Sequence, residues 1–326
     1  MNVRITGTGS ALPARILTNA EISQMVDTSD EWITTRTGIR ERRIAAEGEY
    51  TSTLAAEAGR NALAMAGVAA EEIDLLLVST VTPDFPFPST ACIVQDLLGA
   101  TNATAFDLSA ACAGFIFGLS VADKYIRSGA VKKILVIGAE VLSRTVDWRD
   151  RNTCVLFGDG AGAVVLEATD GEHELLSTHT FSKGAFWNLL YQQGSGSRNP
   201  ATDRRTIDEE RIYLTMEGND VFKHAVRAME EASTAALVAN GISGTDLSFL
   251  IPHQANQRII DATAKRLGIG PERLVINLDR YGNTSSASIP IALDEAHRNG
   301  VIKSGNLVMM VAFGAGFAYG STLVRW

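Results

Sequence analysis

The chain has 326 residues, of which 46% are hydrophobic and 20% charged, and this composition excludes an intrinsically disordered protein. At roughly 100 to 200 residues per domain, the length predicts two domains or one large core built from two halves. The formal net charge of −8 argues against a general nucleic-acid-binding protein, because such proteins need cationic surface to neutralise phosphates.

Cysteine usage and the apolar stretches indicate the compartment. Three cysteines, Cys92, Cys112 and Cys154, cannot form a disulfide framework and indicate free thiols in a reducing environment. Cys92 and Cys154 lie within apolar segments, and we expect both in the core. Residues 1–13 lack the basic and apolar regions of a signal peptide, and the apolar stretch 307–320 is too short to cross a bilayer. We therefore expect a cytoplasmic protein without a membrane partner.

Amphipathic segments that end at a glycine alternate with apolar runs along the chain. The amphipathic segments predict helices capped by glycine in the left-handed conformation, and the apolar runs predict strands covered on both faces. Together they indicate an α/β architecture. In chain order, the predicted elements are helix 53–67, strand 73–81, helix 112–129, strand 133–140, helix 219–241, strand 247–252, helix 257–268 and strand 307–313.

The order of these elements suggests an internal duplication. In each half, a helix that ends at glycine is followed by an aspartate and an apolar strand. The predicted halves are 1–170 and 175–326, and the polar stretch at about 179–210 is expected to be an inserted surface excursion. Further resembling segments follow in the same order: 126–133 with 297–304, and 157–168 with 313–324.

The duplication predicts where the functional residues gather. The offset places Cys112 opposite Gly282 or Asn283, each in a turn from a strand to a helix, while His253 follows the end of an apolar strand. Sites in open α/β sheets lie at the carboxyl ends of the strands. We therefore expect Cys112, His253 and Asn283 to converge in one crevice between the halves.

Each of the three residues has a functional and a structural interpretation. Cys112 begins a helix whose N-terminal dipole favours a thiolate, and its small neighbours leave room for a substrate. It could equally be a buried structural thiol. His253 could be a structural histidine, and Asn283 could be only a turn residue. An asparagine is nevertheless a neutral donor that can stabilise an oxyanion.

Other motifs are absent or misleading. The glycine pattern at 158–162 mimics a dinucleotide fingerprint, but an apolar strand follows it instead of a helix, which argues against NAD binding. No P-loop and no metal-binding spacing occurs, so we expect no metal and no cofactor. The turn at 313–316 is expected to approach another backbone closely and to offer amide donors to an oxyanion.

Longer motifs, in their joint order and spacing, resemble the β-ketoacyl-[acyl-carrier-protein] synthase III family of the thiolase superfamily. The resemblance implies a five-layered αβαβα sandwich of two duplicated halves, and a homodimer. The motifs are DEWITTRTGIRERRI (30–44), DLSAACAGFIFGL (107–119), RDRNTCVLFGDGAGAVVL (149–166), MEGNDVFKHAV (216–226), PHQANQRIIDATAKRLG (252–268), YGNTSSASIPIAL (281–293) and AFGAGFAYGS (312–321).

The resemblance also implies a reaction, the initiating condensation of type II fatty-acid synthesis. Cys112 would take an acyl group from acyl-CoA, with acetyl-CoA as the expected primer. His253 and Asn283 would assist decarboxylation of malonyl-acyl carrier protein, and the resulting enolate would attack the acyl-Cys112 thioester. The backbone N–H groups of Cys112 and Ala315 would hold the oxyanion. The products would be 3-ketoacyl-acyl carrier protein, CoA and CO₂, and the CoA thioesters would be substrates, not cofactors.

The family pattern assigns further residues to binding. The expected CoA-binding residues are Trp32, Arg36, Arg151, Asn219 and Asn256. The expected acyl-pocket residues are Phe87, Leu142 and Phe157, with Phe87 reaching the pocket of the partner subunit. The expected carrier-protein docking residues are Lys223, Gln254, Arg258, Lys265 and Arg266.

Three departures from the family pattern stand out: Ser286 and Ala315 replace commoner small residues, and the excursion at about 179–210 is long. Alternatives remain at this stage. The chain could be a related condensing enzyme of quinolone or polyketide metabolism, an inactive carrier-binding subunit, or a thioester hydrolase. The intact Cys112, His253 and Asn283 set argues against the inactive subunit.

Overall fold

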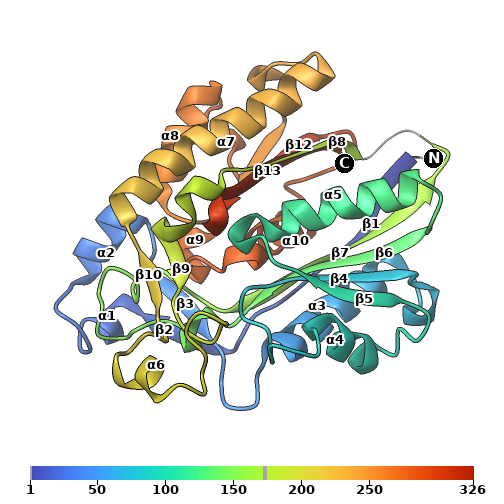
Figure 1. Cartoon of the computed structure of the whole chain (residues 1–326). Coiled ribbons are helices and arrows are strands. Elements are labelled where there is room, and N and C mark those ends of the chain that lie inside the picture. The colour runs from blue at the N-terminus through green and yellow to red at the C-terminus, as the bar shows by residue number, and fades with distance from the viewer. Residues whose placement is uncertain (1, 172–174) are drawn as a thin grey trace.

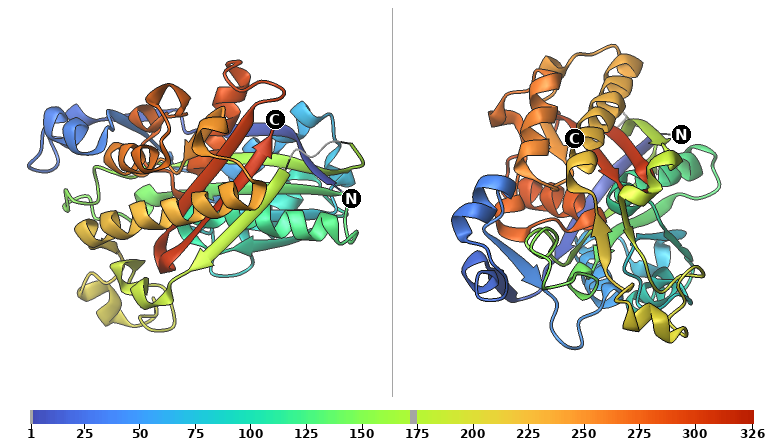
Figure 2. Two further views of the ribbon diagram at one scale, coloured as in Figure 1. Left: turned by 90° about the horizontal axis from the view of Figure 1, so that it is seen from above. Right: turned by 60° about the vertical axis from the view of Figure 1, so that its left-hand side comes forward.

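The computed structural model describes residues 2–171 and 175–326, and its helices and sheets form five layers (Figure 1). Helices α5 (Gly114–Arg127) and α10 (Ser288–Arg298) lie between two sheets and share one buried apolar cluster with both of them. Further helices cover the outer face of each sheet (Figure 2). This is the αβαβα sandwich that the family resemblance implies.

The first sheet comes from the N-terminal half and has the strand order β1-β7-β6-β4-β5. Strand β4 is parallel to β5 and β6, whereas β7 is antiparallel to β6 and β1. All residues of β4 are buried because helices cover both faces. The strands are β1 (Asn2–Ala11), β4 (Leu75–Ser79), β5 (Thr104–Leu108), β6 (Lys133–Glu140) and β7 (Gly160–Thr169).

The second sheet comes from the C-terminal half, in the order β11-β12-β13-β8. Its pairs repeat the orientations of the first sheet, parallel, antiparallel and antiparallel. Strand β5 lies at the edge of the first sheet, beside β4. At the equivalent position of the second sheet, Leu274 forms a single parallel bridge with Leu250 of β11. The matching order supports the duplication, and the boundaries 1–170 and 175–326 stay a prediction. The strands are β8 (Leu175–Ser182), β11 (Phe249–Pro252), β12 (Leu307–Gly314) and β13 (Ala318–Arg325).

Amphipathic helices form the two outer layers. Helices α3 (Thr51–Ala66) and α4 (Thr90–Leu98) pack on the first sheet, and α7 (Gly218–Asn240) and α8 (Gln257–Leu267) pack on the second. Each of these four helices ends at a glycine with positive φ: Gly67, Gly99, Gly241 and Gly268. The sequence predicts this helix end at Gly67, Gly241 and Gly268.

Smaller elements surround the sandwich on the side where the strands end (Figure 1). Strands β2 and β3 pair with each other, and the short helices α1 and α2 lie between them in the chain. Helix α9 follows the Leu274 bridge of the second sheet. The predicted excursion contains β9 and α6, and β9 pairs with β10, which follows the excursion in the chain. These elements are β2 (Arg15–Thr18), α1 (Asn19–Ile22), α2 (Asp30–Thr37), β3 (Glu41–Ile44), β9 (Leu190–Gln192), α6 (Arg204–Asp208), β10 (Leu214–Met216) and α9 (Leu278–Tyr281).

Three expectations about position were wrong. The excursion does not start at 179, because residues 179–182 complete β8 and pair with β13. The difference in residue number that we used to align the two halves was too short. Because α5 and α10 begin at equivalent turns, Cys112 corresponds to Ser286 and not to Gly282 or Asn283. Helix α9 accounts for the residues that the second half has in addition before this turn. Cys92 is exposed on α4, whereas Cys154 is buried as expected. No helix in the described ranges is long and apolar enough to cross a bilayer.

Candidate active site

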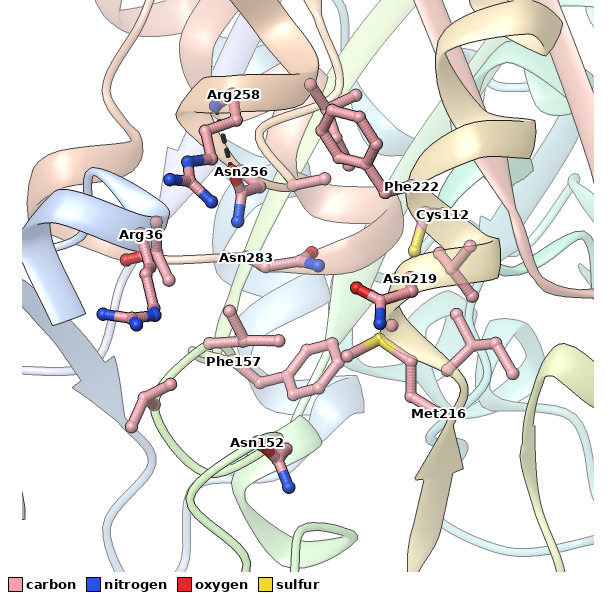
Figure 3. Close-up of a pocket in the computed structure, with 18 of the residues that line it drawn as sticks. Arg36, Cys112, Asn152, Phe157, Met216, Asn219, Phe222, Asn256, Arg258 and Asn283 are labelled. Carbon is pink, nitrogen blue, oxygen red and sulfur yellow. Dashed lines mark hydrogen bonds between the residues drawn. The ribbon is translucent and has the colours of Figure 1, made fainter. Parts of the chain in front are cut away.

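A cavity of about 940 Å³ leads from the surface to the turn that carries Cys112, and we call it the large cavity. Cys112, His253 and Asn283 all line it, so the predicted convergence of the three residues is found. Figure 3 shows the side chains of Cys112, Asn219 and Asn283 directed into this space. They come from elements of both halves, which is why the sequence separates them widely.

Cys112 lies in a tight 3₁₀ turn, Ala111–Ala113, between β5 and α5. Ala111 has a φ of 46°, a strained value for a residue with a Cβ, and such strain persists where the surroundings fix the backbone. Gly314 supplies part of that surrounding, since a Cβ there would lie 2.6 Å from the Cys112 nitrogen. The close backbone approach expected of the 313–316 turn is therefore confirmed.

Cys112 is only 8% exposed. Burial raises the pKa of the thiol to about 12, although a hydrogen bond with Ser285 opposes that change. The helix N-terminus was expected to favour a thiolate, but desolvation outweighs it in this structure. Cys112 therefore rests as a thiol, and its attack on a substrate requires a group that accepts the proton.

His253 follows β11 and is completely buried. Its Nδ1 lies 2.7 Å from the Ser288 hydroxyl, and its Nε2 has no hydrogen-bond partner within the described residues. Burial lowers the pKa of the imidazole to about 3, so the ring is neutral at physiological pH. A buried ring nitrogen without a partner, in the wall of the large cavity, is available to a ligand.

The Asn283 amide is held in one orientation. The backbone N–H of Asn283 donates to the Leu156 carbonyl, and its own carbonyl accepts from Gly158, so the residue is tied to the segment that carries Phe157. Its Oδ1 accepts the Ser285 backbone N–H at 2.9 Å. Because the amide oxygen is occupied, the amide nitrogen is the group left to donate into the cavity.

A second, inner cavity of about 120 Å³ continues beyond the thiol, and Cys112 lines both cavities. Leu142 and Phe157, which are expected in an acyl pocket, line the inner cavity, and so does Ala315, which is expected in the oxyanion turn. Phe87 is 85% exposed and lies outside its own chain's inner cavity. Residues of the β9–β10 hairpin also line the inner cavity: Leu190, Tyr191, Gln192 and Leu214.

The predicted CoA-binding residues lie along the large cavity and its mouth. Trp32, Arg36, Asn219 and Asn256 line the cavity itself. Arg151 lies over the Trp32 ring, with its guanidinium carbon 5.1 Å from the ring centroid. An adenine between these two groups would require Arg151 to move outward, since that spacing already corresponds to direct contact.

Four of the five predicted docking residues are exposed. Lys223 and Arg258 line the large cavity, and Lys265 and Arg266 follow along α8, where Arg266 pairs with Glu230. The prediction for Gln254 was wrong. Its side chain is completely buried and bonds the backbone of Pro252, Val275 and Asn277, so it cannot contact a partner.

Comparison with known proteins identifies the family. Residues 106–184 match the family model described as 3-oxoacyl-[acyl-carrier-protein (ACP)] synthase III, and residues 237–326 match the model of its C-terminal part. A β-ketoacyl-[acyl-carrier-protein] synthase III of Caldanaerobacter subterraneus subsp. tengcongensis is 51% identical over 99% of this chain and 97% of its own length. The chain belongs to the 3-oxoacyl-[acyl-carrier-protein] synthase III family.

Solved structures agree with this assignment to the synthase III family. The crystal structure of 3-oxoacyl-[acyl-carrier-protein] synthase III from Aquifex aeolicus VF5 has a TM-score of 0.93 at 48% identity, over 99% of this chain and 100% of that chain. The priming β-ketosynthase from the R1128 polyketide biosynthetic pathway has a TM-score of 0.91 at 38% identity, over 99% of this chain and 96% of that chain. The predicted fold class, family, acyltransferase class and initiating condensation are confirmed at the level of the family.

Several residues of this synthase III site escaped sequence reasoning. Ser285 and Ser288 stood in the quoted NTSSAS motif without an assigned role, and both contact the central residues. Glu140 follows six apolar residues in its strand, and a charged residue at the buried end of such a run was the signal that it could have a function. No cluster of residues suited to a metal ion occurs in the described ranges.

Proposed function

We propose that this synthase III joins acetyl-CoA, or a primer of similar size, to malonyl-acyl carrier protein through an acyl-Cys112 intermediate. The position of Cys112 between the two cavities carries this proposal. A thioester that enters through the large cavity meets the thiol at its end, and its acyl chain then lies in the inner cavity. The inner cavity of about 120 Å³ favours a short chain. Transfer to Cys112 exchanges one thioester for another, so the acyl group stays activated.

His253 and Asn283 are proposed to hold the malonyl thioester oxygen as the enolate forms. The Ser288 hydroxyl accepts a hydrogen bond from the Gln254 backbone at 3.3 Å, which leaves its own hydrogen for His253 Nδ1. In that arrangement Nε2 carries the imidazole hydrogen and donates into the cavity. Because both donors are neutral, they stabilise the enolate oxygen without an electrostatic attraction that would hold the malonyl carboxylate and oppose the loss of CO₂.

The enolate then attacks the acyl-Cys112 carbonyl. The backbone N–H groups of Cys112 and Ala315 are proposed to hold the resulting oxyanion, and removal of one such donor typically costs about 10² to 10³ in rate. Gly314 supports this role, since its contact with the Cys112 backbone fixes the two turns relative to each other.

The binding assignments remain part of the proposal. Trp32, Arg36, Arg151, Asn219 and Asn256 would hold CoA. Lys223, Arg258, Lys265 and Arg266 would attract the acidic carrier protein to a local basic patch on a protein of net charge −8. The exposed Phe87 fits a homodimer in which it bounds the partner's inner cavity. We propose a cytoplasmic location and no cofactor, nucleic-acid or membrane partner.

Acetylation of the purified protein tests the proposal. After incubation with acetyl-CoA, mass spectrometry of the digested protein should find an acetyl adduct on Cys112. Subsequent malonyl-acyl carrier protein should release CO₂ and form 3-ketoacyl-acyl carrier protein. Failure to form the adduct would indicate the inactive subunit, whereas free acid without CO₂ would indicate a hydrolase. Products released without a carrier protein would favour the polyketide-type alternative.

A further inference from the structure

A buried carboxyl group that the proposed steps do not use lies beneath the nucleophile. Glu140 ends β6 and is completely buried. In the part of the chain that the structure describes, no lysine, arginine or histidine nitrogen lies within 4.0 Å of its oxygens. An unpaired buried carboxylate is costly, so its retention calls for compensating hydrogen bonds or a function.

Hydroxyl and amide groups compensate for the missing cation. Oε2 accepts hydrogen bonds from Thr82 Oγ1 at 2.6 Å, the Val81 nitrogen at 3.1 Å and Thr80 Oγ1 at 3.2 Å. Oε1 is 3.0 Å from each of Ser285 Oγ and Ser286 Oγ. These donors come from the loop after β4 and from the turn before α10, so both halves hold the carboxyl in place.

One of these hydroxyls also reaches the nucleophile. The Ser285 hydroxyl donates to Glu140 Oε1 and lines the inner cavity together with Cys112, and its interaction with the thiol lowers the pKa of Cys112, against the larger effect of burial. A hydroxyl has one hydrogen and can accept another. The thiol hydrogen can therefore point to Ser285 Oγ while the Ser285 hydrogen points to Glu140 Oε1. Ser286 is different, because its hydroxyl is 2.7 Å from the Ser79 carbonyl.

We propose that Glu140, acting through Ser285, receives the Cys112 proton when the thiol attacks the primer. Glu140 is a positioning residue in this scheme, because Ser285 makes the contact with the reacting thiol. The inference deepens the proposed function and rests on it.

The proton transfers balance over the whole cycle. As the bond from Cys112 sulfur to the primer carbonyl carbon forms, the S–H bond breaks, Ser285 takes that proton, and the Ser285 hydrogen moves to Glu140 Oε1. The carbon–sulfur bond to CoA then breaks, and the CoA thiolate takes a proton from solvent. When the enolate attacks, the Cys112–acyl bond breaks and the sulfur regains a proton from Glu140 by the reverse path.

Charge and burial agree with this sequence of steps. The hydroxyl and amide donors that face its two oxygens favour the ionised Glu140 carboxyl, and in that form burial, which raises its pKa, makes it a stronger base than an exposed glutamate. His253 is a poor acceptor for the same proton, since burial lowers the pKa of its imidazole to about 3. Among the groups around the Glu140 carboxyl, Cys112 is the one with a titratable proton, and the remaining contacts are hydroxyls and one backbone amide.

Pre-steady-state acetylation of Cys112 by acetyl-CoA tests the relay, with the acetylated fraction measured by intact mass after rapid quenching. Glu140→Gln keeps the shape of the side chain and removes the proton acceptor, and Ser285→Ala removes the connection. A positioned base contributes about 10² to 10⁴ to a rate, so each variant should acetylate at least about 100-fold more slowly near neutral pH. The rate in Glu140→Gln should then rise about tenfold per pH unit, because solution hydroxide replaces the carboxylate.

Ser286→Ala is the matched control, since it removes the neighbouring hydroxyl from the same carboxylate oxygen without breaking the path to the thiol. Its rate should stay within about threefold of wild type, and its pH profile should be unchanged. A loss in Ser286→Ala equal to that in Ser285→Ala would overturn the relay, as would an unchanged pH profile in Glu140→Gln. Absence of any adduct on the wild-type thiol would instead overturn the proposed function.

Discussion

Acidification tests whether His253 is a buried, neutral imidazole. The pKa of His253 is about 3 in the folded protein, against an ordinary value of 6.5. The unfolded chain therefore binds the proton more tightly, so the native state loses stability as the pH falls below about 6.5 and continues to lose it until the pH approaches the folded value. Between about pH 7.5 and about pH 5, the loss from this one group amounts to about 2 kcal/mol.

Equilibrium unfolding in urea measures this loss, with wild type and His253→Gln compared at one protein concentration and at both pH values. Glutamine does not titrate, so the other ionisable groups cancel in the comparison. The unfolding free energy of wild type should fall by about 2 kcal/mol more than that of the variant. Imidazole ¹⁵N resonances of His253 should also stay unchanged over the same range. Equal losses in the two proteins, or a His253 resonance that titrates near its ordinary pKa, would refute the reasoning.

Three further predictions follow from the cavities and their mouth. Gly314→Ala should lower acetylation of Cys112 at least about 100-fold, because the added Cβ would lie 2.6 Å from the Cys112 nitrogen and displace the oxyanion turn; unimpaired acetylation would contradict that contact. Leu142→Ala should enlarge the inner cavity and raise kcat/KM for butyryl-CoA relative to acetyl-CoA by about tenfold or more, and an unchanged ratio would remove Leu142 from the acyl pocket. Lys265→Glu should raise the KM for malonyl-acyl carrier protein several-fold while acetylation by acetyl-CoA stays constant; equal effects on both would argue against docking on α8.

The fold was largely predictable because its signals are local. Apolar runs and glycine caps each occupy a few neighbouring residues, so strand 133–140 was predicted at its observed bounds and Gly241 ends α7 as expected. The offset between the halves failed where the repeat is interrupted. Helix α9 adds residues only to the second half, and a comparison of short sequence segments from the two halves does not detect such an insertion.

The site was predictable only in part, because burial depends on distant residues. The helix N-terminus beside Cys112 suggested a thiolate, yet the walls supplied by both halves desolvate the sulfur and raise the pKa of the thiol. The family resemblance assigned Gln254 to the carrier-protein docking surface, but its side chain bonds backbone groups in the interior. The contact of Glu140 with Ser285 joins residues 145 positions apart, and no local pattern in either segment predicts it.

The two halves bring the same backbone turn to the same place with different side chains. Ala111 has a φ of 46° and Ser285 a φ of 50°, each in a 3₁₀ turn that leads directly into one of the central helices. Positive φ values in residues with a Cβ cost about 1 to 3 kcal/mol each, so the surrounding structure must hold both turns in place. That rigidity keeps the Cys112 thiol within reach of the Ser285 hydroxyl while its acyl group is loaded and removed. Loss of the hydroxyl by substitution should therefore slow acetylation without loosening the turn, which separates the chemistry of Ser285 from the strain it carries.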